Sequence, residues 1–345
     1  MLINKIKAVI DSLELNLKGK TVLTEAASGA YIVTPLIAAL AGAKVYAFSR
    51  TTHYGTIENI FANTGKLIEE IQDIIPDITL IDTLTPDIIG QADIITNSGH
   101  LRPLNKEKLQ YAKESAVIPL MYEAWEWRES DLDMHYIRKR GIRVGATNER
   151  HPKVDVFNYL GDMAIKQIFD AGLCPYGNKF ILISNNEFGP YISKVLSKVC
   201  ERLGVIDTTN NKNKYDLSQI EWISEFPEIS IPTHFKDAEA IIFTAYPFDN
   251  LWIGDKTSLS IKKIKSLLNN PLILRFAGDI DTKALNNEGI KYFPKYVQSG
   301  HMGILPSDIG YDPILRLQAG GLKVSELLLK NKAHFKENIL SVEIA

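Results

Sequence analysis

The densest group of ionisable side chains in the sequence is the run Asn148-Glu149-Arg150-His151-Pro152. A histidine with an ordinary pKa of about 6.5 can give or take a proton at neutral pH. Glu149 could orient the His151 ring, and Arg150 could bind a carboxylate through its planar guanidinium. We therefore predict His151 and Glu149 as catalytic residues, and Arg150 and Asn148 as substrate-binding residues. An exposed loop closed by a salt bridge explains the same run equally well.

Two more histidines stand beside glycines, which would let a ligand approach the backbone closely. His100 follows Gly99 and is a third catalytic candidate, whereas His301 in Gly300-His301-Met302-Gly303 is a substrate-binding candidate. Either could equally be part of a tight turn. Glu123 and Asn186 complete the predicted substrate-binding residues. No short paired spacing joins these His and Glu residues, so we predict no metal site.

These residues follow apolar segments that alternate with helical patterns every 20 to 30 residues, which is typical of a parallel sheet with covered faces. Strands are predicted at Thr21–Thr24, Lys44–Phe48, Ile78–Ile81, Ala92–Thr96, Ala116–Leu120, Ile142–Gly145, Phe180–Ser184, Ala240–Ala245, Leu272–Phe276 and Lys291–Phe293. Helices are predicted at Met1–Leu17, Ile57–Ile74, Asn105–Lys113, Asp131–Arg140, Val154–Gly172, Tyr191–Leu203, Ser260–Leu268 and Asp312–Lys330. Ligands of such sheets bind outside the carboxyl ends of the strands.

We predict an α/β protein of two Rossmann-like domains with parallel sheets around a central cleft. Residues 1–152 would form a nucleotide-binding domain with an N-terminal helix, and residues 153–175 a bridging helix. Residues 176–345 would form the second domain, whose last helix could cross back onto the first. Thr208–Lys214 is polar throughout and is predicted to be a surface loop, the least structured part of the chain.

The predicted cofactor site is the turn after the first strand, Ala26–Ala30, where small residues would let the backbone approach a pyrophosphate. Thr34 suits a helix N-cap and Pro35 the first helical position, which predicts that the regular helix begins only at that point. The strict Gly-x-Gly-x-x-Gly pattern is absent, and only Gly29 stands where it requires a glycine.

Arg50, at the end of the second strand, favours NADP over NAD because a guanidinium can meet a 2′-phosphate. An exposed arginine at a strand end is the alternative. The predicted cofactor-binding residues are Ser28, Gly29, Ala30, Tyr31, Ser49, Arg50, Thr51, Asn97, Ser98 and Gly99.

A family resemblance rests on three segments. Lys18-Gly19-Lys20-Thr21-Val22, and the block from Ala92 to His100 with the strand after it, resemble the cofactor domain of D-2-hydroxyacid dehydrogenases and S-adenosylhomocysteine hydrolases. Ala26–Ala30 resembles the Ala-Ser-Gly turn of some medium-chain reductases. The resemblance covers residues 20–150 and implies a Rossmann domain that binds NAD or NADP. The catalytic Arg, Glu and His of these families have no match, so no catalytic residue is carried over.

The composition is that of a soluble protein: 345 residues, 45% hydrophobic and 23% charged. A net charge of -2 gives no reason to expect nucleic acid or an acidic membrane as partner. Cys174 and Cys200 are too few for a disulfide framework, so we expect a cytoplasmic protein. Homodimer formation stays open.

The leading functional prediction is an NAD(P)-dependent oxidoreductase of a small polar metabolite, which could carry a carboxylate. Two facing Rossmann domains would also suit a nucleotide-sugar transferase or epimerase. The eroded glycine pattern would suit a dinucleotide sensor that has lost catalysis.

Overall fold

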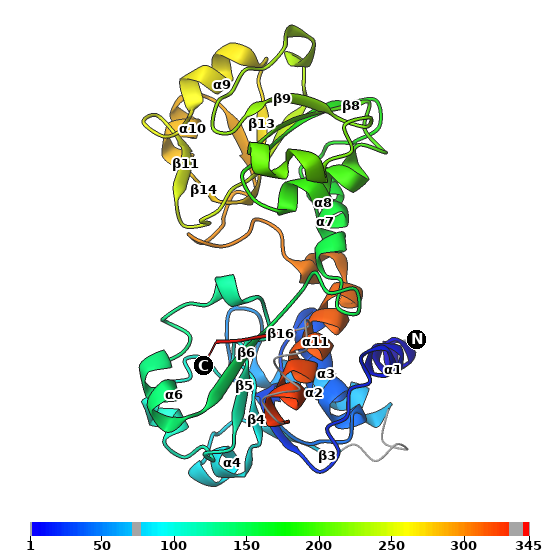
Figure 1. The fold of residues 1–345 in the computed structure, drawn as a ribbon, viewed down its shortest axis with the longest axis vertical. Helices are drawn as coiled ribbons and strands as arrows, with labels where there is room; N and C mark the ends of the chain where they lie inside the picture. Colours follow the sequence, from blue (N-terminus) through cyan, green and yellow to red (C-terminus); the bar gives the residue numbers. More distant parts are fainter. Residues whose placement is uncertain (1, 71–76, 331–340, 345) are drawn as a thin grey trace. The chain divides into compact units, whose positions relative to one another are not determined.

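A computed structural model describes residues 2–70, 77–330 and 341–344. They form two compact units (Figure 1): unit 1 comprises Met1–Val156 and Gly310–Ala345, and unit 2 comprises Phe157–Ile309. Unit 2 is thus inserted into the sequence of unit 1. The C-terminal helix α11 (Tyr311–Leu329) belongs to unit 1, which agrees with the predicted crossing of the last helix onto the first domain. Unit 2 therefore ends before the predicted end of the second domain, residues 176–345.

Unit 1 is built on a seven-stranded sheet with the strand order β16-β6-β5-β4-β1-β2-β3. The strands are β1 (Thr21–Glu25), β2 (Lys44–Phe48), β3 (Asp77–Ile81), β4 (Ile94–Ile95), β5 (Val117–Pro119), β6 (Arg143–Thr147) and β16 (Ser341–Glu343). All pairs are parallel except β16 with β6. The direction of strand succession reverses between β1 and β4, which creates the switch point where α/β sheets bind ligands.

The helices and 3-10 turns of unit 1 cover this sheet. They are α1 (Leu2–Leu13), η1 (Gly29–Ile32), α2 (Val33–Leu40), α3 (Ile57–Glu69), α4 (Pro86–Gln91), α5 (Lys106–Leu109), η3 (Ala124–Glu126), α6 (Met134–Arg140) and α11. The predicted helix Ile57–Ile74 is α3 as far as Glu69, and its residues 71–74 lie outside the described part of the chain.

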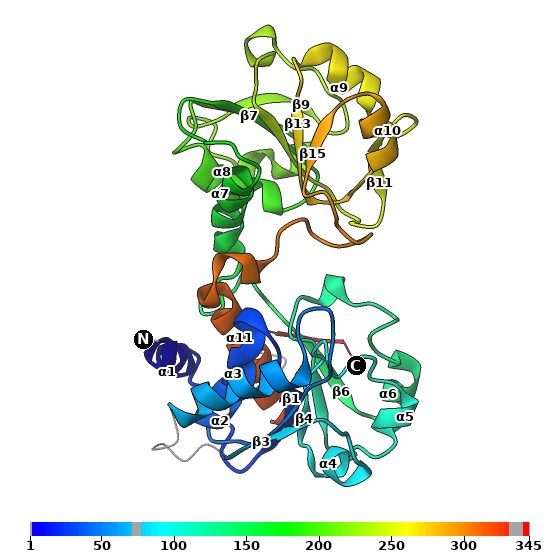
Figure 2. The same cartoon turned by 180° about the vertical axis from the view of Figure 1, so that it is seen from behind.

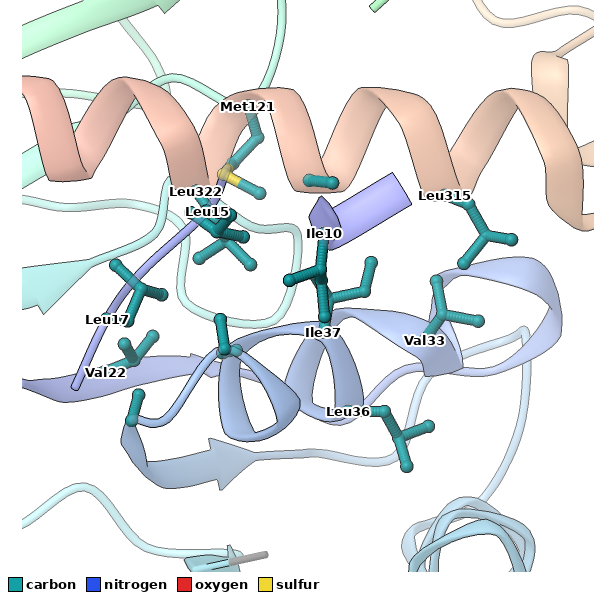
Figure 3. Packing of buried hydrophobic residues seen from close by; sticks show 14 of the residues in the cluster. Ile10, Leu15, Leu17, Val22, Val33, Leu36, Ile37, Met121, Leu315 and Leu322 are labelled. Atoms are coloured by element: carbon teal, nitrogen blue, oxygen red, sulfur yellow. The ribbon is translucent and has the colours of Figure 1, made fainter. Parts of the chain in front are cut away.

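Most residues of helix α11 are buried, and among them are the polar residues Gln318, Ser325 and Glu326. Figure 3 shows Leu315 projecting from α11 toward Val33 of α2, within the same apolar cluster. Gly321 lets the helix approach closely, because a Cβ added there would lie 2.6 Å from the Met121 sulfur. Thr34, predicted as a helix cap, is instead buried, and its hydroxyl donates to the Gln318 side chain at 3.0 Å. Helix α2 begins at Val33.

Unit 2 repeats the same strand order in a fully parallel six-stranded sheet, β15-β13-β10-β7-β8-β9. Figure 2 labels β7, β9, β13 and β15 of this sheet. Its strands are β7 (Lys179–Ser184), β8 (Arg202–Asp207), β9 (Glu221–Glu225), β10 (Ala240–Thr244), β13 (Leu272–Ala277) and β15 (Lys291–Phe293). A small second sheet contains β11 (Leu251–Gly254), β12 (Leu259–Ser260) and β14 (Asp279–Ile280).

The helices and 3-10 turns of unit 2 are η4 (Phe157–Tyr159), α7 (Leu160–Asp170), α8 (Phe188–Leu196), η5 (Thr209–Lys214), η6 (Thr233–Phe235), α9 (Ile261–Leu267), α10 (Thr282–Asn287) and η7 (Pro306–Ile309). The predicted bridging helix begins later than expected, because Asp155 adopts φ +52° and a 3-10 turn precedes Leu160. The regular helix therefore lies wholly in unit 2.

Two predictions in unit 2 are wrong. The predicted helix Tyr191–Leu203 ends at Leu196, and a new strand, β8, begins at Arg202. The segment Thr208–Lys214 is not the least structured part of the chain, because it forms η5. Asn211 of that turn is buried, since its side-chain amide donates to the Asp207 carboxylate at 3.1 Å.

Candidate functional site

Most of the predicted site residues gather at the carboxyl edge of the unit 1 sheet. Ser28 follows β1, Arg50 follows β2, Asn97 follows β4, Glu123 follows β5 and Glu149 follows β6. Parallel strands end at the same edge, so the structure brings these loops together as the sequence predicts. The exceptions are Asn186 and His301, which belong to unit 2.

Glu25, the last residue of β1, is a buried carboxyl that the sequence did not single out. Its Oε2 accepts a hydrogen bond from the His100 backbone N–H at 3.0 Å. Burial raises the pKa of Glu25, although this hydrogen bond and the nearby Arg102 guanidinium oppose the shift. The sequence did contain one hint of this site, because Glu25 directly follows a predicted strand. A charged residue that is buried at such a position almost always has a partner.

His100 is buried, and its Nδ1 accepts a hydrogen bond from the Arg50 backbone N–H at 3.0 Å. The proton of the neutral ring therefore sits on Nε2. Burial, together with the Arg50 charge, lowers the pKa of His100, which favours this neutral form. The Arg50 guanidinium donates to the Gly99 carbonyl at 3.4 Å, so the predicted cofactor and catalytic residues meet here.

Three glutamates and an arginine form a second group, after β5 and β6. Glu123 is buried, and its Oε1 accepts from the Glu149 N–H at 2.9 Å and from Arg150 Nη1 at 3.0 Å. Glu126, which is half-buried, accepts from the Glu123 N–H at 3.3 Å. We call Glu123, Glu126 and Glu149 the glutamate cluster.

The glutamate cluster contains two carboxyls that hold protons unusually tightly. Burial raises the pKa of Glu126 to about 7, and the Glu123 charge adds to the shift. Burial, reinforced by the Glu126 and Glu123 charges, raises the pKa of Glu149 well above its usual range. Neighbouring carboxyls of this kind can retain a proton at neutral pH, which is the property that a general acid requires.

Tyr31 links the turn after β1 to these acids. Burial raises its pKa, and the Glu25 and Glu149 charges reinforce the shift, so its hydroxyl keeps its proton. Arg102 is a further residue that the sequence did not indicate: its Nε donates to the Asn97 side chain at 3.1 Å. The Arg102 guanidinium also lies 5.2 Å from the centre of the Tyr122 ring.

His151 does not occupy the position we predicted relative to Glu149. Its Nδ1 accepts from the Lys153 backbone N–H at 3.2 Å, and within the described residues no hydrogen bond joins its ring to Glu149. Burial, with the Lys153 charge, lowers the pKa of His151. Glu149 bonds instead through its backbone N–H to Glu123, so the structure does not show the predicted orienting hydrogen bond.

The turn after β1 is open at the backbone. Gly29 adopts φ +61°, and a Cβ added there would meet no atom within 4 Å. No side chain of the described residues caps η1 or α2. A helix start that no side chain caps is suited to an anion.

The two predicted residues of unit 2 each have local partners. Asn186 follows β7 and donates through Nδ2 to the Thr244 hydroxyl at 3.2 Å. His301 lies in the loop after β15, where Nδ1 is 3.1 Å from the Ser299 carbonyl.

Among the described residues, no group of three His, Cys, Asp or Glu side chains could hold a metal ion. The described helices include none with the length and apolar character needed to cross a bilayer.

No protein-family model matches the chain, and no curated protein matches it in sequence. Solved structures do match in fold. A dipicolinate synthase structure from Bacillus halodurans superposes with a TM-score of 0.56 at 11% identity, covering 91% of this chain and 99% of that chain. A dipicolinate synthase structure from Bacillus subtilis gives 0.55 at 12% identity, covering 94% and 100%. The chain shares their fold. This likeness, with the two sheets described above, confirms the predicted pair of Rossmann-like domains.

Proposed function

We propose that the chain is an NAD(P)-dependent oxidoreductase that acts on a small polar metabolite. The observation that carries this proposal is the glutamate cluster at the edge of a Rossmann-type sheet, in which Glu126 and Glu149 have raised pKa values. Reduction of a carbonyl needs one hydride and one proton, so a carboxyl that is still protonated at neutral pH is a suitable donor. The fold shared with dipicolinate synthase supports a small polar substrate, because dipicolinate is a small dicarboxylate.

The turn after β1 is our proposed cofactor site. Ser28, Gly29, Ala30 and Tyr31 would hold the pyrophosphate, because the turn is open and its helix start is not capped by a side chain. Arg50 would bind the 2′-phosphate of NADP, since no carboxylate of the described residues forms a salt bridge with it. The nicotinamide would supply the hydride-transfer chemistry.

The remaining residues have distinct proposed roles. Glu149 donates or accepts the substrate proton, and the nearby Glu126 charge favours the protonated form of Glu149. Glu123 holds the Arg150 guanidinium, which would bind a substrate carboxylate. His100 presents Nε2–H as a neutral hydrogen-bond donor.

Calorimetric titration of the full chain with NADPH, NADH and a UDP-sugar tests the proposal. We expect the Arg50→Asp variant to bind NADPH at least about tenfold more weakly and to bind NADH almost unchanged, since tenfold corresponds to about 1.4 kcal/mol. Arg138→Asp makes the same charge change at an exposed position of α6 and should leave both affinities unchanged. An equal loss for both dinucleotides would remove Arg50 from the account. Binding of the UDP-sugar but of neither dinucleotide would overturn the proposed function in favour of a transferase or epimerase.

A further inference from the structure

Unit 2 has a switch point of its own, between β7 and β10, because its sheet repeats the strand order of unit 1. A dinucleotide at such a point lies against the turn after the first strand and against an acidic side chain at the end of the second. The corresponding segments of unit 2 are the run Ser184–Gly189 and Asp207, which ends β8. Their contacts show whether they are available to a ligand.

The run Ser184-Asn185-Asn186-Glu187-Phe188-Gly189 keeps only the third glycine of the dinucleotide pattern. That glycine serves close packing of helix on strand, and a Cβ added at Gly189 would lie 2.7 Å from the Ser184 hydroxyl. The first two glycines, which provide the tight turn and the close approach of the pyrophosphate, are Ser184 and Asn186 here. Unit 2 therefore keeps the glycine for helix–strand packing and lacks the two glycines that let a pyrophosphate approach the backbone.

Asn186 fills the position next to the start of α8. Its Oδ1 accepts from the Phe188 backbone N–H at 3.0 Å, and Phe188 is the first residue of that helix. Its Nδ2 donates to the Thr244 hydroxyl at the end of β10. Its carbonyl accepts from Ser184 and from Asn211. A phosphate here would have to displace a side chain that already satisfies the helix amide.

Asp207 stands where an acidic residue would bind the ribose hydroxyls, but both of its oxygens are occupied. Oδ2 accepts from the Tyr215 hydroxyl at 2.5 Å, and Oδ1 accepts from Asn211 Nδ2 at 3.1 Å and from the Thr208 N–H at 2.6 Å. The residue is fully buried, at 0% exposure, and burial raises the pKa of both Asp207 and Tyr215. The ribose would have to break this buried network to reach the carboxylate.

The charge at the start of α8 also opposes a phosphate. Glu187 precedes the first residue of the helix, and its carboxylate pairs with Lys214 at 2.8 Å. An acidic residue therefore stands at the helix start, where the helix dipole favours an anion.

We infer that the switch point of unit 2 binds no dinucleotide, because the chain's own side chains make the hydrogen bonds that a pyrophosphate and a ribose would make. The inference rests on the proposed function only in assigning the cofactor to the turn after β1. On this view the hydrogen-bonded side chains form a structural network that ties η5 to β7 and β10. The network consists of Asn186, Asp207, Asn211 and Tyr215.

The test measures dinucleotide binding by Asp207→Asn and Tyr215→Phe variants of the full chain, with circular dichroism to confirm folding. We expect NADPH and NADH affinities within about twofold of the wild type in both variants, against a loss of about tenfold for NADPH in Arg50→Asp. A tenfold loss in a folded Asp207→Asn or Tyr215→Phe variant would overturn the inference. Tyr215→Phe keeps the carboxylate and removes only one hydrogen bond, so it remains informative if Asp207→Asn does not fold.

Hydrogen exchange of the wild type gives an independent readout that needs no variant. We expect saturating NADPH to leave exchange of the Phe188 and Thr208 amides unchanged, and protection of either amide would overturn the inference. If the wild type binds neither dinucleotide, the proposed function fails, whereas the inference about unit 2 stands.

Discussion

Replacing Glu126 with glutamine should make the stability of unit 1 less dependent on pH. Burial raises the pKa of Glu126 from 4.5 to about 7 in the folded protein. A carboxyl whose folded pKa is raised contributes stability that is fully present below its unfolded pKa and is lost as the pH rises through its folded pKa. The wild type should therefore lose free energy of unfolding between about pH 4.5 and about pH 7 through this group.

The size of the effect follows from the shift. A difference between 4.5 and about 7 corresponds to roughly 3 kcal/mol, at about 1.4 kcal/mol per pH unit. Because the Glu126 side chain is half-buried, solvent screens part of this energy, and we expect about 1–3 kcal/mol. Glutamine keeps the oxygen that accepts from the Glu123 N–H, so the variant removes the ionisation and retains the turn.

The assay is urea unfolding at about pH 5 and about pH 8, on either side of the raised pKa. Trp125 and Trp127 flank Glu126 in unit 1, whereas Trp222 and Trp252 lie in unit 2. A parent protein that carries Trp222→Phe and Trp252→Phe therefore reports fluorescence from unit 1 alone. The difference in unfolding free energy between the two pH values should be about 1–3 kcal/mol smaller in Glu126→Gln than in its parent. Glu129→Gln, at an exposed neighbouring position, is the control and should match the parent. Equal pH dependence in the parent and Glu126→Gln would refute a raised Glu126 pKa.

Two glycines give opposite predictions for stability. A Cβ added at Gly303 would lie 1.9 Å from the Arg275 carbonyl oxygen, so we expect Gly303→Ala to destabilise unit 2 by at least about 1–3 kcal/mol in a denaturant titration. An unchanged midpoint would mean that the close approach of this loop to β13 is not as described. Gly65 lies within α3 with no atom within 4 Å of an added Cβ, so Gly65→Ala should raise the stability of unit 1 by about 0.5–1 kcal/mol. A lower melting temperature in that variant would contradict the open space around Gly65.

The strands that the sequence predicts correctly are those with a clear local pattern. β2 has the predicted bounds, because Lys44–Phe48 is a short apolar run after the turn residues Gly42 and Ala43. β8 was missed because the helical pattern of Tyr191–Leu203 continues into Arg202 with no Gly or Pro to mark the end of the helix. A continuous helical spacing in the sequence does not show where the helix ends and where pairing with a neighbouring strand begins.

The domain division and Thr34 show where local patterns carry too little information. The hydroxyl of Thr34 bonds with Gln318, 284 residues later in the sequence, so its predicted role as a cap gives way to a tertiary contact. Long-range packing also assigns α11 to unit 1, a crossing that the sequence analysis left as one possibility. Nothing near either residue in the sequence indicates the other.

The candidate site shows the same limit. The loops that carry Arg50, His100, Glu123 and Glu149 were predicted, because each follows an apolar strand of a parallel sheet. Glu25 was not, since a glutamate at a strand end ordinarily faces solvent, and only the loop of His100 across the switch point makes it a buried partner.

A crystal structure of the full chain with NADPH tests the proposed cofactor site most directly. We expect the dinucleotide at the turn after β1, with the pyrophosphate against Ser28–Tyr31 and the 2′-phosphate at the Arg50 guanidinium. Density for the dinucleotide at the start of α8, beside Asn186 and Asp207, would contradict both the proposed site and the inference about unit 2.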